Sequence, residues 1–358
     1  MIHLELSHFH KEIGGKMIDY SGFNMPVQYE GVIAEHLCVR DNVGVFDVSH
    51  MGEIFIHGKE AKLFLQYITS NNVDKLFPGK VQYSCLPNKN GGIVDDILVY
   101  MLKENSFMLV VNASNIQKDY DWLTSNNSFD CIIDNKSKDF SLLAVQGPKS
   151  KDLIQKLTDA DLNSLVYYTF TTNKILDIND VLISRTGYTG ELGYELYVKN
   201  KDVKKLWDIL FSNEDKLKPI GLAARNTLRL EKGFCLYGND INDTTSPLEA
   251  GLDWITDLST NFINSSNLKK QKENGLEKSL IGFEIIGKGI ARQDYEVYNS
   301  NNEIIGIVTS GSMSPSLNKA IGMAYIKTSE IHMNNNLLVK VRNKFIDAKI
   351  VNVPFLQC

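Results

Sequence analysis

The sequence predicts an α+β protein that ends in a small all-β domain. Two observations carry this prediction. Strand-like and helix-like stretches alternate with antiparallel hairpins through about the first 250 residues, and only short strand-like stretches follow a polar, Lys- and Asn-rich segment. The 358 residues, 43% hydrophobic and 23% charged, are typical of a globular protein of two or three domains. We expect an α+β region over 1–263, a linker over 264–279 and a β-barrel domain over 280–358.

The α+β region divides into two similar sets of elements. Alternating and helical hydrophobic periodicity predicts the first set: strand 52–57, helix 59–69, strands 81–86, 93–102 and 108–112, and helix 115–123. The turn Asn88-Lys89-Asn90-Gly91-Gly92 joins two of these strands as a hairpin. The second set comprises strand 140–145, helix 148–157, strands 181–184 and 194–198, and helices 203–211 and 221–232. Residues 281–350 contain short strands broken by Gly, Asn and Ser-Pro turns, which is typical of a small barrel.

Charge and composition exclude several function classes. A net charge of −5 argues against a protein that neutralises nucleic-acid phosphates, and no apolar run reaches the roughly 18 residues of a membrane span. The N-terminus lacks the pattern of a signal or transit peptide. The five cysteines are far apart and the histidines lack metal spacing, so we expect no disulfide framework, no metal and a reducing cytoplasm. No glycine-rich phosphate loop is present, and we expect a monomer.

Six stretches stand out by their composition and order: Gly22–Pro26, Phe46–Glu53, Gly91–Asp96, Arg185–Glu195, Leu228–Asp240 and Thr309–Leu317. Together they resemble the aminomethyltransferase family of the glycine cleavage system, also called the T-proteins. The resemblance extends from about residue 8 to residue 355. One such stretch is weak support for a family, but six in register are strong support.

The resemblance implies a fold of two ferredoxin-like α/β modules plus a C-terminal β-barrel, arranged around a hole that holds tetrahydrofolate. It implies a reaction in which the aminomethyl group on the lipoyl arm of H-protein passes to tetrahydrofolate. The products are 5,10-methylenetetrahydrofolate and ammonia. The implied partners are lipoylated H-protein and, in the same system, glycine decarboxylase and dihydrolipoyl dehydrogenase.

Two adjacent aspartates lie on the predicted strand 93–102. Their side chains point to opposite faces, so Asp95 and Asp96 cannot form a carboxylate pair, and Asp96 shares its face with Tyr100. Asp96 matches the family's catalytic aspartate. The resemblance implies that it orients the amine N10 of folate and accepts its proton. We expect Asp95 to end the hairpin turn.

A second carboxylate, Glu195, matches the family's pterin-binding glutamate. An ionised carboxylate can accept paired hydrogen bonds from the N–H groups of a pterin edge. Tyr188 matches a tyrosine of the same pocket, whereas Glu191 can be purely structural. The alternative for the whole segment Arg185–Glu195 is a plain turn between two strands.

One arginine and several aromatic residues complete the candidate site. The resemblance places Arg225 near the ligand, whereas Arg229 is expected to be structural, paired with Glu231 or an aspartate elsewhere. The resemblance also implies aromatic or polar ligand contacts by Tyr83, Tyr100, Tyr168, Trp254 and Asn112. In the Ser-His-Met-Gly stretch, Met51 is expected to line the entrance for the lipoyl arm, and His50 to have a structural role.

Two departures from the family pattern are visible. The chain stops at Cys358, so contacts that a longer tail makes in some relatives are in doubt, and Phe234 replaces a tyrosine of some relatives. Two alternative functions share the scaffold. One is a non-enzymatic folate-binding protein that supports iron–sulfur enzymes, whose Lys-Gly-Cys pattern is displaced here because Cys235 comes one place late. The other is a folate-dependent demethylase. A flavin-linked oxidase of this scaffold would require a dinucleotide domain.

Overall fold

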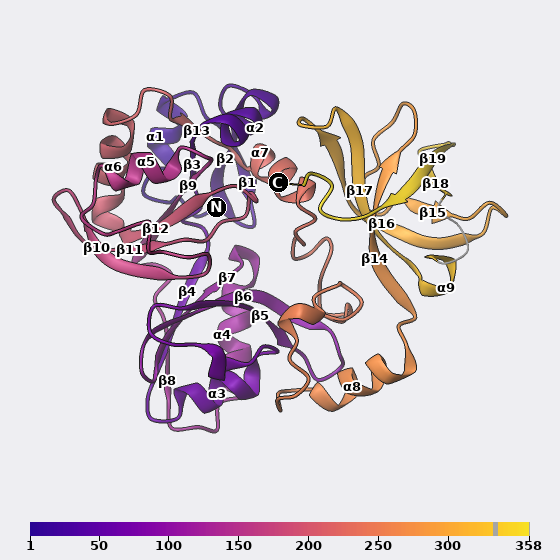
Figure 1. Ribbon diagram of the computed structural model, residues 1–358, viewed down its shortest axis with the longest axis horizontal. Helices are drawn as coiled ribbons and strands as arrows, with labels where there is room; N and C mark the ends of the chain where they lie inside the picture. Colours follow the sequence, from indigo (N-terminus) through magenta and orange to yellow (C-terminus); the bar gives the residue numbers. More distant parts are fainter. Residues whose placement is uncertain (332–335, 358) are drawn as a thin grey trace. The chain divides into compact units, whose positions relative to one another are not determined.

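The computed structural model describes residues 1–331 and 336–357 (Figure 1). The chain forms two compact units, each built from several segments. Unit 1 comprises Met1–Leu65, Val73–Tyr83 and Ile97–Asn226. Unit 2 comprises Gln66–Asn72, Ser84–Asp96 and the described residues from Thr227 onward. The chain therefore passes between the units five times, after residues 65, 72, 83, 96 and 226.

A six-stranded sheet forms one half of unit 1. In spatial order its strands are β10 (Phe170–Ile175), β11 (Ile178–Ser184), β12 (Gly193–Lys199), β9 (Phe140–Gln146), β3 (Gly44–Asp47) and β13 (Lys218–Pro219). All neighbours are antiparallel except β13 and β3. The helices of this half are α5 (Ser150–Gln155) and α6 (Asn200–Ser212), and their apolar side chains share one core with the sheet.

The side chains of β12 alternate between this core and the opposite face of the sheet. Tyr194, Leu196 and Val198 belong to the core that includes Trp207 of α6. Because side chains alternate along a strand, the intervening Glu195 and Tyr197 project from the other face.

A five-stranded antiparallel sheet follows the order β5 (Val81–Pro87), β6 (Ile93–Lys103), β7 (Ser106–Val111), β4 (Gly52–His57) and β8 (Ile132–Asn135). Its helices are α3 (Ala61–Ile68) and α4 (Ile116–Ser125), with the short 3-10 helices η1 (Val73–Lys75) and η2 (Ala113–Asn115). The strands β5 and β6 correspond to the predicted hairpin over 81–86 and 93–102. The elements preceding this sheet are α1 (Ser7–Glu12), β1 (Lys16–Tyr20), β2 (Phe23–Gln28) and α2 (Val32–Asp41).

Unit 2 contains a closed antiparallel barrel, drawn in orange to yellow in Figure 1. Its strand order is β14 (Lys278–Ile285), β17 (Lys319–Lys327), β16 (Ile304–Ser314), β15 (Glu296–Tyr298), β18 (Asn336–Val341) and β19 (Lys344–Val351), and the barrel closes where β19 pairs with β14. The short helix α9 (Thr328–Ile331) contacts β17 and β14, whereas the 3-10 helix η3 (Asp253–Ile255) accepts a hydrogen bond from the hydroxyl of Ser70 at 2.9 Å. The barrel has a core of its own, built from inward-facing aliphatic residues and Phe283.

Two helices can be compared directly with the predicted linker and the predicted helix 221–232. The segment predicted as a linker, 264–279, contains α8 (Ser265–Asn274), which buries Ser265 and Leu268 and otherwise displays polar residues. Helix α7 (Leu222–Glu231) begins in unit 1 and ends in unit 2, close to the predicted helix 221–232. The α+β class and the C-terminal barrel are confirmed. Among the described residues, no helix has the length and apolar character needed to cross a membrane.

Candidate active site

Glu195 lies on β12, directly opposite Ser184 of β11. Its carboxylate is half-buried, and Thr186 donates a hydrogen bond to its Oε2 atom. Burial raises the pKa of Glu195, while the hydrogen bond from Thr186 and the charge of Arg225 act in the opposite direction. The site therefore contains a partly desolvated carboxylate that is stabilised by the hydroxyl of Thr186 and by the charge of Arg225.

The connection from β11 to β12 owes its shape to a buried glutamine. Gln146 of β9 donates from Nε2 to the carbonyl of Thr186 at 3.2 Å and accepts from the hydroxyl of Thr189 at 2.9 Å. A Cβ atom at Gly187 or Gly193 would come within 2.1 or 2.3 Å of this side chain. The recurring glycines of the sequence therefore leave room for Gln146, which fixes the segment that carries Thr186.

Arg225 and Tyr188 form a pair in unit 1. The guanidinium carbon of Arg225 lies 4.3 Å from the centroid of the Tyr188 ring, which is cation–π geometry. The helix α7 that carries Arg225 begins beside Gly221, whose N–H donates to the buried carboxylate of Glu35 at 2.7 Å. Arg225 also acts electrostatically on Glu195. The structure thus brings together three residues that the sequence predicted, Glu195, Tyr188 and Arg225.

Glu191 has a different role from Glu195. Its Oε1 atom accepts a hydrogen bond from Arg40 at 2.9 Å, and Arg40 also donates to the carbonyl of Thr189 at 2.7 Å. This ion pair braces the same connection between β11 and β12. Glu191 is therefore structural, in agreement with the sequence analysis.

Two predicted aromatic residues lie near Glu195. Tyr168 is half-buried, adopts a left-handed backbone conformation with φ +62°, and has its ring 4.4 Å from that of Tyr167. Burial raises its pKa, with Glu195 among the smaller causes. Tyr100 of β6 has no exposed surface, and its hydroxyl bonds to other protein hydroxyls, including Ser184. Its ring consequently presents no surface to a ligand in this structure.

Three further predicted residues occupy strand ends or a turn in unit 1. Tyr83 lies on β5, Asn112 follows β7 as the residue before η2, and Met51 occupies the turn before β4. All three are half-buried. Half-buried side chains retain surface that a ligand can reach, and the ligand contacts of these three residues stay predictions.

The turn that carries His50 and Met51 is fixed by Asp47. Its Oδ1 atom accepts from the N–H and the hydroxyl of Ser49 at 2.9 and 2.6 Å, and its Oδ2 atom lies 2.9 Å from His10. Burial alone would raise the pKa of Asp47, but His10 and Ser49 hold it below its usual value.

The imidazole of His50 is unsuited to proton transfer near neutral pH. Burial, and secondly the charge of Arg225, lower the pKa of His50 to about 3. The ring packs edge-on to Tyr20 and Phe23, and its Nδ1 atom has no hydrogen-bond partner among the described residues. His50 is therefore a packing residue, and the structural role expected from the sequence does not extend to a hydrogen bond at Nδ1.

The two aspartates of β6 in unit 2 differ in burial. Asp96 is half-buried, whereas Asp95 is fully buried inside the strand. The prediction that Asp95 ends the hairpin turn is wrong, because β6 begins at Ile93. The N–H of Ile93 donates to the carbonyl of Asn242 at 3.0 Å and its carbonyl accepts from Tyr237 at 2.9 Å, so the strand is anchored before Asp95.

Asp96 lies close to two buried thiols in unit 2. Burial raises the pKa of Cys85 and of Cys235, and the negative charge of Asp96 adds to both shifts. Cys235 is buried, and Gly233, with φ +69°, follows the end of α7. Neutral thiols beside Asp96 provide an environment of low polarity for its carboxylate.

Two other predictions concern unit 2. Arg229 is structural, because its Nη1 atom lies 2.7 Å from the buried carboxylate of Asp240. Trp254 in η3 is 63% exposed, so its ring presents a large apolar surface. An exposed tryptophan is suited to contact a flat ligand or a partner.

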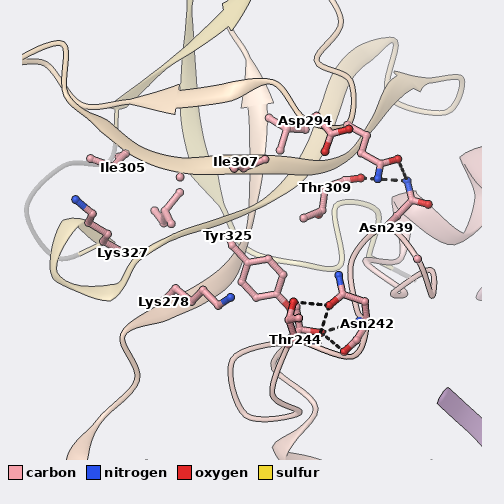
Figure 2. A pocket seen from close by; sticks show the side chains of 16 residues that line it. Asn239, Asn242, Thr244, Lys278, Asp294, Ile305, Ile307, Thr309, Tyr325 and Lys327 are labelled. Carbon is pink, nitrogen blue, oxygen red and sulfur yellow. Dashed lines mark hydrogen bonds between the residues drawn. The ribbon is translucent and has the colours of Figure 1, made fainter. Parts of the chain in front are cut away.

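A cavity of about 380 Å³ lies beside the barrel in unit 2 (Figure 2). Side chains of Asn239, Asn242, Lys278, Asp294 and Tyr325 are among those lining it, and Tyr325 projects between the strands and the 238–245 segment. None of the individually predicted site residues lines this cavity, although Gly238, Asn239 and Thr309 belong to two of the six stretches singled out in the sequence.

Comparison with known proteins decides the family. The description "GCVT N-terminal domain" matches residues 6–260, and "Glycine cleavage T-protein C-terminal barrel domain" matches residues 278–357. The chain belongs to the glycine cleavage T-protein family. Similar relatives are the aminomethyltransferases of Flavobacterium psychrophilum, 51% identical over 98% of both chains, and of Bacteroides thetaiotaomicron, 49% identical over 97% of both.

A solved structure of the T-protein family has the same fold. The crystal structure of glycine cleavage system aminomethyltransferase T from Bartonella henselae superposes with a TM-score of 0.93 at 31% identity. It covers 99% of this chain, and this chain covers 98% of it. The predicted arrangement of α/β modules followed by a barrel is therefore that of a known family member.

Sequence reasoning missed several residues around Glu195. Thr186 lies inside a family stretch and could have been considered, because a hydroxyl beside a carboxylate is a common support. No sequence pattern indicated a role in the site for Ser184, Tyr197 or Glu53. They come from different strands and are brought together only by the folded unit.

Proposed function

We infer that this chain transfers the one-carbon unit of an aminomethylated lipoyl arm to tetrahydrofolate, giving 5,10-methylenetetrahydrofolate and ammonia. The observation that carries this function is the nearly full-length match to curated aminomethyltransferases at about half identical residues. The chain is an aminomethyltransferase of glycine cleavage, and its family is folate-dependent in general.

For the ligand, the proposal assigns the pterin edge of tetrahydrofolate to Glu195. A pterin presents several N–H donors on one edge, and an ionised carboxylate accepts them in pairs. The support is the half-exposed position of this carboxylate and the hydrogen bond that Thr186 gives to one of its oxygens. Arg225, held against Tyr188, is assigned to carbonyl or carboxylate oxygens of the same ligand.

The flat rings of the ligand require apolar walls and a few polar contacts. The proposal assigns these to Tyr83, Tyr168 and Trp254, with a polar contact from Asn112. Exposed or half-exposed surface on each of them supports this assignment. Tyr100 keeps a role in the proposal, but as a residue that acts on Glu195.

Asp96 is assigned the acid–base role. It would orient N10 of tetrahydrofolate and accept its proton while the methylene carbon becomes bonded to both N5 and N10. Its half-buried position in β6 supports this assignment, because the side chain keeps surface that a ligand can reach.

The donor of the one-carbon unit is proposed to be lipoylated H-protein, working with glycine decarboxylase and dihydrolipoyl dehydrogenase. Met51 would line the entrance of the lipoyl arm, since a flexible thioether adapts to an aliphatic chain. With a net charge of −5, docking of an acidic partner would need a local basic patch. We further propose a cytoplasmic monomer whose α+β region covers 1–263 and whose barrel domain covers 280–358.

The direct test mixes the purified protein with tetrahydrofolate and aminomethyl-loaded H-protein and measures ammonia release. Release that depends on both substrates is the expected result. Folate binding without release would support a binding protein, and turnover of a methylated amine or sulfonium compound instead would support a demethylase. The position of Cys235, one place late for the binding-protein pattern, favours the transferase.

Two variants separate binding from chemistry. Asp96→Asn is expected to keep tetrahydrofolate affinity within a few-fold while turnover falls by about 10²-fold or more, the usual scale for losing an acid–base group. Glu195→Ala is expected to weaken tetrahydrofolate binding before it affects the chemical step. Glu191→Ala serves as the matched control, because the carboxylate of Glu191 pairs with Arg40. Near-normal turnover of Asp96→Asn would remove Asp96 from the mechanism.

A further inference from the structure

Four buried hydroxyl groups lie beside Glu195, and three of them, those of Tyr197, Tyr100 and Thr186, form a continuous series that ends at its carboxylate. The hydroxyl of Tyr197 lies 3.0 Å from that of Tyr100, and the hydroxyl of Tyr100 lies 3.1 Å from Ser184 and 3.3 Å from Thr186. Ser184 and Thr186 have their hydroxyl oxygens 2.9 Å apart, and Thr186 donates to Oε2 of Glu195. All four residues are at most 2% exposed.

The hydroxyls meet because three strands of unit 1 contribute to them. Tyr197 and Glu195 project from the same face of β12, and Ser184 lies opposite Glu195 on β11. Tyr100 reaches this face from β6, with its ring 5.7 Å from that of Tyr197 in an edge-to-face arrangement. The series is thus fixed by packing.

The number of protons decides the direction of the series. Each hydroxyl has one proton to donate, and an ionised carboxylate only accepts. If Thr186 donates to Glu195, its oxygen accepts from Tyr100, whose hydroxyl lies 3.3 Å away, and Tyr100 accepts from Tyr197. These three O–H groups then point toward Glu195, and Ser184 lies beside them as an acceptor. Among the described residues the hydroxyl of Tyr197 has no hydrogen-bond partner besides Tyr100. If Tyr100 donated to Tyr197 instead, the hydroxyl proton of Tyr197 would have no acceptor.

The far end of the series holds a carboxyl that does not compete for these protons. Glu53 of β4 is 1% exposed, and neither of its oxygens has a hydrogen-bond partner in the described part of the chain. Burial raises the pKa of Glu53 well above its ordinary value. Glu53 acts electrostatically on Tyr197, which places the two groups near each other. Because the oxygens of Glu53 accept no hydrogen bond among the described residues, the partner of the Tyr197 hydroxyl is Tyr100.

We propose that Tyr197, Tyr100 and Thr186 act as one polarised hydroxyl series that holds Glu195 ionised and fixes its Oε2 atom, leaving Oε1 for the ligand. Naming the pterin edge as that ligand rests on the proposed function. Tyr100 and Tyr197 are thereby positioning residues that act through Glu195 without touching the ligand.

Other groups also act on Glu195, and they set the background for the effect of the series. Arg225 lowers its proton affinity from α7, and the tyrosines at 167 and 168 are coupled to it electrostatically, as are Tyr100 and Tyr197. These groups stay in place when a single hydroxyl of the series is removed. The effect of the series can therefore be measured by deleting one oxygen atom.

The test compares Tyr100→Phe and Tyr197→Phe with Tyr194→Phe. Tyr194 lies on the same strand, is equally buried and has a hydroxyl without a hydrogen-bond partner in the described residues, so it controls for loss of a buried hydroxyl. Two quantities are followed against pH in the full-length protein: the ¹³C carboxyl signal of Glu195 and the dissociation constant of tetrahydrofolate.

In both series variants the Glu195 midpoint is expected to rise by about half to one pH unit, because a direct hydrogen bond to a charge is worth about one to two pH units and the two tyrosines act through Thr186. Because binding needs the ionised form, tetrahydrofolate affinity should fall by about 3- to 10-fold below both midpoints and return to within about twofold well above them. Tyr194→Phe and Glu53→Gln should keep the wild-type midpoint. A purely structural defect would weaken binding equally at every pH.

The outcomes separate this inference from the proposed function. A carboxyl midpoint that stays at the wild-type value in Tyr100→Phe and Tyr197→Phe overturns the inference, whatever happens to folate. A shifted midpoint in protein that does not bind tetrahydrofolate supports the series and refutes the proposed ligand. If Tyr100→Phe does not fold, Tyr197→Phe and Thr186→Val decide the same question, with Thr186→Ser expected to restore the wild-type midpoint.

Discussion

Replacing Asp240 with asparagine tests what holds the end of α7 to the barrel in unit 2. The pair Arg229–Asp240 is 2% and 0% exposed. Besides Arg229, Asp240 accepts from the hydroxyls of Thr309 and Ser310 at 2.6 and 2.9 Å and from the N–H of Leu236 at 2.9 Å. Both carboxylate oxygens are therefore surrounded by donors.

An asparagine at this position keeps the shape but removes the charge. Whichever way the amide is oriented, its NH₂ group faces a donor, and the buried guanidinium of Arg229 loses the charge of Asp240. Breaking a buried ion pair by removing one partner costs about 3–5 kcal/mol. We expect Asp240→Asn to lower the free energy of unfolding by about this amount.

The assay is urea unfolding followed by circular dichroism, with Asp208→Asn as the control. Asp208 pairs with Lys204 at 2.6 Å, but its side chain is 56% exposed, so the loss there should stay below about 1 kcal/mol. A loss for Asp240→Asn no larger than that of the control would show that the buried pair does not stabilise the fold, and the argument from desolvation would fail.

Two further predictions follow from unit 1. Because burial and Arg225 lower the pKa of His50 to about 3, its imidazole should show no NMR titration between pH 5 and 8. The folded-state pKa of His50 is below the unfolded value of about 6.5, so the free energy of unfolding should decline as pH falls from about 6.5 toward 3. His50→Asn should make this decline less steep. An NMR titration of His50 near pH 6.5 would contradict both expectations. Gly187→Ala places a methyl group 2.1 Å from the side chain of Gln146, so it should lower the free energy of unfolding by about 1–3 kcal/mol and weaken tetrahydrofolate binding. Adding Gln146→Ala to this variant should restore part of the lost stability. A Gly187→Ala protein as stable as the wild type would refute the close packing.

Local patterns predicted the strands and helices that bury one face. The alternation in β12 and the hairpin at residues 88–92 are visible in the sequence because burial of one face imposes a period of two. Helix α8 was not predicted, because Leu268 is its single buried apolar residue and the segment shows no apolar stripe. Its polar composition was taken for that of a linker.

Long-range contacts explain the errors at single residues. Asp95 was placed in the turn because nothing near it in the sequence indicates where the strand starts. The anchor of that start is the carbonyl of Asn242, from a distant part of the chain. Similarly, the resemblance identified Glu195 but assigned Tyr100 to a ligand wall, whereas its hydroxyl bonds to Ser184 from another sheet. Such pairings depend on which strands the fold brings together.

The five passages of the chain between its two units limit how the protein can be divided. A fragment that ends near residue 226 would carry the 66–72 and 84–96 segments without the rest of their unit, and a fragment that begins there would lack both. The N-terminal piece would contain all segments of unit 1, whereas unit 2 would be divided between the two pieces. During synthesis on the ribosome, the 66–72 and 84–96 segments must therefore wait for the C-terminal third before their contacts in unit 2 are complete, and split-protein or domain-exchange engineering at residue 226 would divide unit 2.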